Sequence, residues 1–410
     1  MTIEVVSIGD ELLSGSSINT NAAFIGQKLL EAGFVVERQS VIGDDVDMLF
    51  QIWKEALKRS KVVIVTGGLG PTLDDITKET AAKFFKSPLK FDSQVAEDLK
   101  KRFGEGLSTL ENQATVPENA IVMPNEVGTA PGFIFHEEGT ILFLLPGVPK
   151  EMEPMLLKQA IPYLKKHIKQ DQRPYVQSLA FYGLNEAAIN PTLLSLKEKY
   201  PVAQFGIYPG FGKVSVVISC TSLNASEAKK ILEDCFNTLA EKFKSHFFDF
   251  KTDKIEEAIH EQFKKKKLTL SMAESCTGGR ISAKLTTLSG ASDFFLGSIV
   301  CYSNFMKTKC LSISETLLKE KGAVSKECVQ EMADALLKLT GSDYSLAVSG
   351  IAGPTGGTPT KPVGTVFGAI GMQGQLPKIF EFHLPGSREC VIESAANMLL
   401  FELYRLIHTD

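Results

Sequence analysis

The chain has 410 residues, of which 44% are hydrophobic and 22% are charged, and its formal net charge is −4. This composition is typical of folded globular proteins and excludes wholesale disorder, while the length predicts two to four domains. A negative net charge provides no basic field for a phosphate backbone, so nucleic acid is not expected as the main ligand.

The first residues, MTIEVVSIGDELL, form an acidic, strand-like run rather than a signal segment, and no run of about 18 apolar residues follows. The seven cysteines show neither CxxC nor Cys/His spacing. That arrangement argues against a disulfide framework and against a structural zinc site. We therefore expect a cytoplasmic protein without a membrane-spanning segment.

Apolar strands and helical stretches alternate in the first part of the chain. The expected strands are IEVVSIG, FVVERQSVIG, KVVIVTGG, GTAPGFIF and GTILFLLPGVP, and the expected helices cover 18–32, 45–59 and 149–169. Strands separated by single helices indicate a parallel, doubly wound sheet that is covered on both faces. We assign this α/β domain to residues 1–169.

Two further domains are expected after the polar segment QDQRP (170–174), which is predicted to be a linker. Residues 170–250 combine strands and helices in a small α+β pattern, with strands at 175–183, 202–210 and 213–219 and a helix at 225–245. Residues 251–410 are again α/β, with strands in KLTLSMA, FFLGSIVCYS, DYSLAVSG, PVGTVFGAIG and KIFEFHL and one long helix after the second of these. The fold class is therefore α/β, with two doubly wound domains joined by a small α+β domain.

The first and third domains share the pattern V-[TS]-G-x-x-G-P-T, in VTGGLGPT (65–72) and VSGIAGPT (348–355). Each copy follows a buried strand. One interpretation is convergent turn chemistry, since glycine allows positive φ and proline fixes φ. The other is a pair of small-molecule sites, because open α/β sheets bind ligands at the carboxyl ends of their strands.

The stretch SMAESCTGGR (271–280) runs from a strand through a Gly-Gly turn into a helix. Ser275 and Thr277 lie just before that helix, whose free N–H groups and dipole favour an anion such as an oxyanion or a phosphate. Alternatively, either residue is only an N-cap. Cys276 is the stronger nucleophile in principle, but it has no histidine partner, so we prefer Ser275.

A serine nucleophile needs a base, and none of the six histidines has a plausible triad context. Lys307, in CYSNFMK (301–307), is the remaining candidate. Its amine must be uncharged to accept a proton, which requires burial to lower its pKa from about 10.4 to about 7 or 8. Tyr302 is expected to relay the proton or to orient the ammonium group.

Five motifs in order carry a family resemblance over about 160 residues. They are AESCTGGR (273–280), YSNFMK (302–307), KGAVS (321–325), SGIAGPTGG (349–357) and KPVGTV (361–366). Together they resemble the nicotinamide-nucleotide amidase domain of the competence/damage-inducible protein A (CinA) family. The resemblance implies hydrolysis of the carboxamide of nicotinamide mononucleotide, without a metal, to the acid and ammonia. Ser275 is then the nucleophile, Lys307 the base, Tyr302 its partner and Ser349 a further hydroxyl.

The substrate contacts are expected from the two glycine-containing loops. Nearby backbone N–H groups would hold the oxyanion, and the 350–357 loop with Arg388 would hold the nucleotide phosphate. The predicted substrate-binding residues are Thr277, Gly278, Gly279, Gly350, Gly353 and Arg388. Relatives commonly carry a second arginine four residues after the arginine of PGSR, where this chain has Ile392, a departure that weakens phosphate binding or marks an inactive relative.

Four motifs of the first domain are IGDELLSG (8–15), VTGGLGPTLDDIT (65–77), GTAPGF (128–133) and LPGVPKEM (145–152). They resemble the N-terminal, molybdopterin-binding-like domain of the same family, which in some relatives is a metal-dependent ADP-ribose pyrophosphatase. The expected nucleotide-binding residues are Thr66, Gly67, Gly68, Gly70, Pro71, Thr72 and Gly147. The carboxylates expected to hold a divalent cation are Asp10, Glu11, Asp74 and Asp75.

Adjacent side chains face different ways, so we expect one of Asp74 and Asp75 at the ligand and the other capping the following helix. The middle domain resembles the family's connecting domain, which has been likened to a KH fold. Its GFGK sequence (210–213) is not the GxxG loop that clamps nucleotides, so we expect it to connect and to support a homodimer.

Two other functions stay open at this stage. The first is a non-catalytic nucleotide- or pterin-binding regulatory protein linked to competence or DNA damage. The second, molybdopterin adenylylation by the first domain, depends on fold analogy alone.

Overall fold

The computed structural model describes residues 2–137, 139–168, 173–222, 224–250, 252 and 254–409. The chain divides into two compact units, residues 1–176 with 220–229 and residues 177–219 with 230–410. The predicted linker at 170–174 lies mostly outside the described residues, and strand β9 (Arg173–Tyr182) already begins within it. Within those described ranges, no helix is long and apolar enough to cross a bilayer.

The first unit contains a six-stranded sheet with the order β2-β1-β3-β8-β7-β6. Its strands are β1 (Ile3–Ile8), β2 (Val36–Ile42), β3 (Val62–Thr66), β6 (Ile121–Met123), β7 (Gly132–Glu137) and β8 (Thr140–Leu145). Strands β2, β1, β3 and β8 are parallel, as predicted. Strand β7 runs antiparallel to both of its neighbours, β6 and β8. Strands β7 and β8 are joined by a short hairpin, which leaves no room for a crossover helix.

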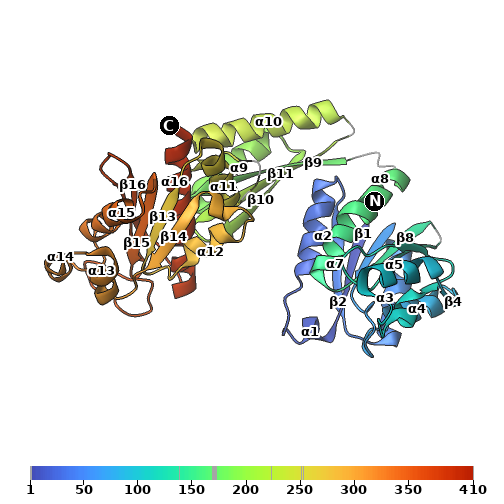
Figure 1. Cartoon of the computed structure of the whole chain (residues 1–410). Helices are drawn as coiled ribbons and strands as arrows, with labels where there is room; N and C mark the ends of the chain where they lie inside the picture. Colours follow the sequence, from blue (N-terminus) through green and yellow to red (C-terminus); the bar gives the residue numbers. More distant parts are fainter. Residues whose placement is uncertain are drawn as a thin grey trace. The chain divides into compact units, whose positions relative to one another are not determined.

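Helices cover both faces of this sheet (Figure 1). One face packs on α2 (Thr20–Glu31), α7 (Pro149–Met155), a π-helical turn (Leu156–Ala160) and α8 (Ile161–His167), and the other on α3 (Val46–Arg59) and α4 (Thr77–Phe84). The shorter elements are α1 (Asp10–Leu13), β4 (Leu89–Phe91), α5 (Ser93–Phe103), α6 (Leu110–Ala114) and β5 (Thr115–Pro117). Helices α2 and α3 begin where predicted because the side chains of Asn19 and Asp45 accept hydrogen bonds from their first turns.

The second unit contains a five-stranded sheet with the order β14-β13-β15-β16-β17. Its strands are β13 (Leu270–Glu274), β14 (Phe295–Val300), β15 (Tyr344–Gly350), β16 (Thr365–Met372) and β17 (Lys378–His383). Helices α11 (Ile255–Lys266), α12 (Arg280–Thr286) and α16 (Arg388–Thr409) pack on one face, and α13 (Asn304–Leu311), α14 (Glu315–Glu320) and α15 (Lys326–Thr340) on the other. The parallel strands β14, β13 and β15 bring their carboxyl ends to one edge.

The single long helix predicted after β14 is wrong, because three helices, α13, α14 and α15, occupy that segment. Ser312 ends α13 in the left-handed region (φ 55°), and Gly322 adopts φ 79° before α15. Ser314 and Ser325 then cap the next two helices by accepting hydrogen bonds from Leu317 N and Cys328 N. Serine at helix starts and positive φ at helix ends are the local signals that break the pattern.

The middle segment forms a four-stranded sheet, β10-β11-β9-β12, with β10 (Ala203–Gly210), β11 (Lys213–Ser222), β12 (Phe247–Phe248), α9 (Glu186–Lys199) and α10 (Ala225–Lys242). The GFGK turn lies against α16, where Phe211 O accepts a hydrogen bond of 2.8 Å from Asn397 Nδ2. The ring of Tyr182 stacks on Phe401 at 4.7 Å between centroids. The middle segment therefore shares a hydrophobic core with the C-terminal helix, and its turn serves packing.

Candidate active site

Ser275 and Lys307 meet at the carboxyl edge of the second sheet. Ser275 follows β13 and is 7% exposed, and Lys307 projects inward from α13 and is 1% exposed. Lys307 Nζ lies 2.8 Å from Ser275 Oγ. The predicted contact between the amine at 307 and the hydroxyl at 275 is therefore confirmed.

Lys307 has carbonyl oxygens rather than a carboxylate as its other neighbours. Its Nζ lies 2.8 Å from Cys301 O and 3.5 Å from Tyr302 O. In the part of the chain that the structure describes, no carboxylate lies within 4 Å of it. The two carbonyl oxygens and the Ser275 hydroxyl are thus the three groups around the amine. The arrangement can accept the proton of that serine.

Cys276 is unsuited to be the nucleophile. Burial raises the pKa of its thiol to about 12, so the thiolate is scarce near neutral pH. The side chain belongs to the hydrophobic core of the second unit. A Cβ on Gly350 would lie only 3.1 Å from Cys276 Sγ and 2.7 Å from Val366 Cγ2. The glycine at 350 is thus required by close packing.

Glu274, which the sequence analysis missed, occupies the helix N-terminus that was predicted to attract an anion. Its carboxylate accepts hydrogen bonds from Thr277 Oγ1 (2.7 Å), Gly279 N (3.1 Å), Ile281 N (3.1 Å) and Ser282 N (2.9 Å). Gly278 N is bonded to Ser275 O at 3.0 Å. Neither Ser275 nor Thr277 is the N-cap of α12, a position taken by Gly279. The expected anion site is filled by the chain's own carboxylate.

Tyr302 and Arg388 interact directly across the mouth of the site. The hydroxyl of Tyr302 lies 2.5 Å from Arg388 Nη2, and Arg388 Nη1 donates a 2.9 Å hydrogen bond to Gly353 O. In the described chain, Tyr302 reaches Lys307 only through its backbone carbonyl. The hydroxyl that we expected to relay a proton or to orient the Lys307 ammonium group is engaged with the guanidinium group instead.

The remaining predicted residues of this site lie near the same edge. Ser349 is buried in β15, directly after Val348, whose carbonyl oxygen accepts a hydrogen bond from Ser275 N. Gly353 adopts φ 81°, a conformation that favours glycine. Ile392, at the position where the family resemblance led us to expect a second arginine, packs against the hydrophobic core through α16. Of the two arginines expected to bind the substrate phosphate, this chain therefore has only Arg388.

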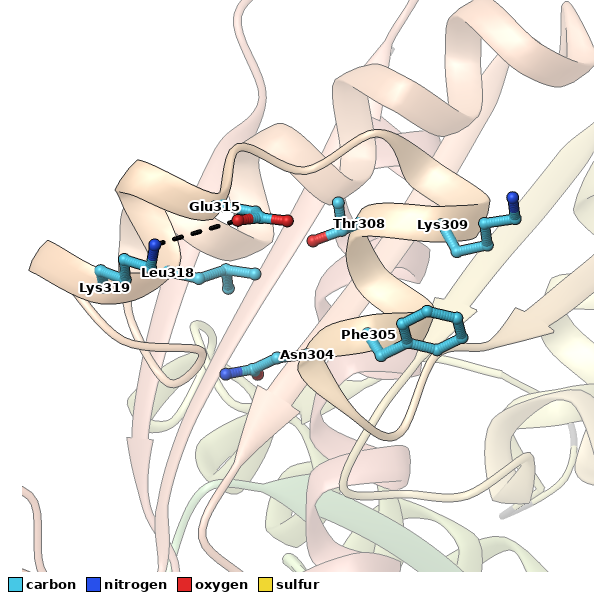
Figure 2. Close-up of a pocket in the computed structure, with 7 residues that line it drawn as sticks. All are labelled: Asn304, Phe305, Thr308, Lys309, Glu315, Leu318 and Lys319. Carbon is cyan, nitrogen blue, oxygen red and sulfur yellow. Dashed lines mark ion pairs between the residues drawn. The ribbon is translucent and has the colours of Figure 1, made fainter.

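A separate hollow of about 400 Å³ lies between α13 and α14 (Figure 2). It is lined by Asn304, Phe305, Thr308, Lys309, Glu315, Leu318 and Lys319. Phe305 is 72% exposed, and Glu315 forms an exposed ion pair with Lys319. Lys307 projects from the same helix but is buried and does not line this hollow. The hollow is therefore distinct from the Ser275–Lys307 site.

The first unit has a pocket of about 450 Å³ at the carboxyl ends of its strands. It is lined by Ile8, Glu11, Asp44, Gly67, Gly68, Gly70, Pro71, Asp74, Asp75, Thr129, Ala130, Pro146, Gly147, Val148 and Glu151. The predicted loops after β1, β3 and β8 thus come together. Asp44 and Glu151 were not predicted. Asp44 follows β2, and since parallel neighbours end at one edge, its place beside the β1 loop was a usable signal.

Hydrogen bonds within the chain already engage much of the predicted phosphate loop. Gly67 N donates to Leu145 O (3.1 Å), and Gly70 N donates to Asp75 Oδ1 (2.8 Å). Thr66 Oγ1 donates to Pro146 O (2.8 Å), while Asn21 Nδ2 bridges Thr66 Oγ1 and Gly147 O. Gly67 and Gly70, two of the expected nucleotide-binding residues, therefore use their N–H groups to stabilise the loop.

Asp74 and Asp75 both turn back onto Thr72. Asp75 Oδ2 accepts hydrogen bonds from Thr72 N (2.9 Å) and Thr72 Oγ1 (2.5 Å), and Thr72 Oγ1 also contacts Asp74 Oδ1. Helix α4 starts at Thr77 after Ile76, without a side-chain cap. We predicted that one of these two aspartates would cap the following helix. That prediction is wrong, because no side chain caps α4.

Near the pocket, the carboxylates of Asp10 and Asp44 each accept a hydrogen bond from the backbone N–H of the other residue. Asp10 N lies 3.1 Å from Asp44 Oδ2, and Asp44 N lies 3.2 Å from Asp10 Oδ1. Burial raises the pKa of Asp44, and the charges of Asp10, Glu11 and Asp74 raise it further, while the Asp10 N–H opposes them. Over residues 2–137 and the other described ranges, no three acidic, histidine or cysteine side chains converge as a metal site. The predicted carboxylates thus do not form a ready-made cation site.

Two parts of the chain match known protein families. Residues 252–407 match the CinA C-terminal domain, and residues 4–166 match the probable molybdopterin binding domain. A CinA-like protein of Kosmotoga olearia is 39% identical over 404 residues, 98% of this chain and 97% of that protein. A putative competence-damage inducible protein of Caldicellulosiruptor saccharolyticus is 38% identical over 99% of both chains.

Among solved structures, a CinA protein of unknown function from Thermoplasma acidophilum is 38% identical, with a TM-score of 0.38. It covers 41% of this chain and 98% of its own. The curated relatives, by contrast, align with this chain over nearly its whole length. The chain therefore belongs to the CinA family, with a molybdopterin-binding-like N-terminal domain and a CinA C-terminal domain.

Proposed function

We propose that the C-terminal domain hydrolyses the carboxamide of nicotinamide mononucleotide, giving nicotinic acid mononucleotide and ammonia in pyridine-nucleotide salvage. The observation that carries this proposal is the 2.8 Å contact between Lys307 Nζ and Ser275 Oγ inside a buried site. Amide hydrolysis by a covalent route requires a nucleophile with an adjacent base, and a serine hydroxyl beside a buried amine is one such arrangement.

The two residues account for each proton transfer. Ser275 Oγ attacks the amide carbon while Lys307 accepts the hydroxyl proton, and a tetrahedral intermediate forms. Lys307 then returns that proton to the departing nitrogen, the C–N bond breaks and ammonia leaves an acyl ester on Ser275. Water attacks the ester, gives a proton to Lys307, and the Ser275 hydroxyl is restored with release of the acid.

The substrate phosphate is assigned to Arg388 in this proposal. The N-terminus of α12 is already filled by Glu274, which excludes a second anion there. Arg388 is fixed by Tyr302 and by Gly353 O, and a guanidinium group retains further N–H donors beyond those two contacts. Tyr302 then acts by orienting Arg388 rather than by relaying a proton from Lys307.

Ammonia release from nicotinamide mononucleotide tests the proposal. We expect turnover by the wild-type chain and its loss in Ser275→Ala and in Lys307→Ala, with Cys276→Ala as the matched control that stays active. Turnover that survives both of the first two substitutions would contradict the mechanism. No turnover by the wild type, combined with tight nucleotide binding, would favour the regulatory, non-catalytic alternative linked to competence or DNA damage.

A second function is proposed for the first unit, where the 450 Å³ pocket joins glycine loops to hard carboxylate oxygens. We infer that it binds ADP-ribose and hydrolyses the pyrophosphate with the help of a divalent cation, for which Glu11 and Asp44 offer oxygen ligands at the pocket wall. Because the carboxylates do not converge on one point, we assign no catalytic step to a metal.

The full chain with ADP-ribose tests this second function, with and without Mg²⁺ or Mn²⁺. We expect AMP to form in a metal-dependent way, and Asp44→Asn to reduce it while Asp47→Asn, an exposed helix residue, does not. Binding of ADP-ribose without AMP formation would indicate that this domain binds the ligand but does not hydrolyse it. Transfer of the AMP group of ATP to molybdopterin, with release of pyrophosphate, would instead favour adenylylation.

A further inference from the structure

Glu274 is a buried carboxylate directly before the candidate nucleophile. It is 0% exposed and ends β13. Its Oε2 accepts hydrogen bonds from Thr277 Oγ1, Gly279 N and Ile281 N, and its Oε1 from Ser282 N at 2.9 Å and from Ser282 Oγ. Five donors on one carboxylate offset the large cost of burying its charge.

The donors come from the turn that contains Ser275 and from the helix that follows it. On the strand side, Cys301 N donates to Glu274 O (2.9 Å) and Ser275 N donates to Val348 O (3.1 Å). On the turn side, the Glu274 side chain binds residues 277, 279, 281 and 282. Ser275 is therefore held between a fixed strand end and a fixed helix start.

The same contacts close the positive end of α12. Its first N–H groups point at Glu274, so they cannot bind a phosphate or an oxyanion from the substrate. An anion that enters this site must use other donors. The carboxylate thus has two effects, one on the position of the serine and one on where an anion binds.

We propose that Glu274 is a positioning residue that fixes the Ser275 hydroxyl against Lys307 and directs the substrate's anionic group away from α12. The identity of the substrate depends on the proposed amidase function, but the positioning of Ser275 does not. Glutamine at 274 would present an NH₂ group to backbone donors and would release the turn. Because a misplacement of about 1 Å costs roughly 10²-fold in rate, kcat should fall by about 10²-fold, with KM little changed.

Covalent labelling of Ser275 in the full chain tests the positioning without knowledge of the substrate. A sulfonyl fluoride reacts when Ser275 Oγ attacks sulfur, fluoride leaves and Lys307 takes the proton, and the intact mass reports the adduct. We expect the wild type to be labelled and Glu274→Gln to be labelled about 10²-fold more slowly. The control Glu389→Gln removes an exposed partner of Arg280 and should react like the wild type.

Two milder variants cover the case in which Glu274→Gln fails to fold. Thr277→Val and Ser282→Ala each remove one hydroxyl donor to the same carboxylate, but only Thr277 belongs to the turn beside Ser275. We expect labelling to slow about tenfold in Thr277→Val, the loss of about one hydrogen bond to a charged group, and to change little in Ser282→Ala. Thermal unfolding of each variant confirms that folded protein is compared.

Formate adds a readout that a merely structural role would not give. In Glu274→Ala the vacated helix N-terminus should bind formate, and labelling of Ser275 should recover with formate concentration while the wild type does not respond. Labelling of Glu274→Gln and Thr277→Val at the wild-type rate overturns the proposal, as does a wild type that is never labelled. A wild type that is labelled but releases no ammonia contradicts the amidase function and leaves the positioning role standing.

Discussion

The loops after β3 and β15 share one sequence pattern but are stabilised in different ways. After β3, the far end of the loop is held by its own groups, with Gly70 N and Thr72 bound to Asp75, while its start is held by Leu145 O and Pro146 O. After β15, the loop is held from outside, because Arg388 donates to Gly353 O and Lys361 Nζ donates to Val324 O at 2.6 Å. The pattern specifies a turn at a strand end, and the neighbouring elements decide what that turn does.

The same difference extends to the chemistry of the two sites. In the second unit a base and a nucleophile are already 2.8 Å apart. In the first unit the carboxylates line a pocket without converging, and Asp75 is engaged in the loop. The activity of the preassembled site should depend on single side chains. Ligand binding in the pocket should instead depend on an intact loop. Four substitutions test this contrast.

The largest effect is expected at the preassembled site. Lys307→Met keeps the length and apolar stem of the buried side chain and removes only the amine. We expect kcat for ammonia release to fall by about 10³-fold or more, because general base catalysis is lost. Cys276→Ala, one residue from the nucleophile, is the control. A Lys307→Met enzyme with more than a tenth of wild-type activity would show that another group is the base.

The next largest effect is expected in the self-stabilised loop. Asp75→Ala removes the acceptor of Gly70 N, Thr72 N and Thr72 Oγ1. Hydrogen bonds to charged groups contribute about 1.5–3 kcal/mol, so we expect a loss of stability of about 2 kcal/mol and weaker binding of ADP-ribose. Urea unfolding and calorimetric titration measure the two effects. An equal loss of stability in the control Asp74→Ala, at the exposed neighbour, would contradict a special role for Asp75 in the loop.

Tyr302→Phe separates two roles of one hydroxyl. If that hydroxyl orients Arg388, as its 2.5 Å contact indicates, the substitution should raise KM for nicotinamide mononucleotide about tenfold, the equivalent of one hydrogen bond. In that case kcat should change little. A proton relay would instead lower kcat with KM unchanged. Steady-state kinetics on the wild type, Tyr302→Phe and Arg388→Lys decide between them.

The smallest effect concerns pH and Asp44. A carboxyl whose pKa is raised in the folded state favours folding when protonated, and this contribution is lost as pH rises through the folded pKa. An asparagine side chain stays neutral at every pH, so Asp44→Asn should be more stable than the wild type at about pH 7, by up to about 0.5 kcal/mol. The difference should vanish toward about pH 3, below the ordinary pKa of an aspartate. Urea unfolding across this range tests it, and a less stable variant at neutral pH would contradict it.

Much of the site could be predicted because strand ends carry local signals. Ser275 and Lys307 were identified since each follows an apolar strand and no histidine offered an alternative base. Asp44 and Asn21 were missed because their partners come from distant loops. Glu274 was missed although its donors follow it closely in the chain, because we assigned those donors to an external anion. The three helices after β14 were also missed, since a single left-handed residue, Ser312, and serine caps interrupt an otherwise helical pattern.

The sequence by itself determined the elements, the class of the fold and the residue types at the ends of the strands, because hydrophobic periodicity and capping act over a few residues. Only the tertiary structure decided the pairings. Lys307 meets Ser275 across 32 residues, and Arg388 meets Tyr302 across 86, because the order of the strands brings their carboxyl ends together. The turn after β13, by contrast, folds locally, and it brings Glu274 to the helix N-terminus where we expected an external anion.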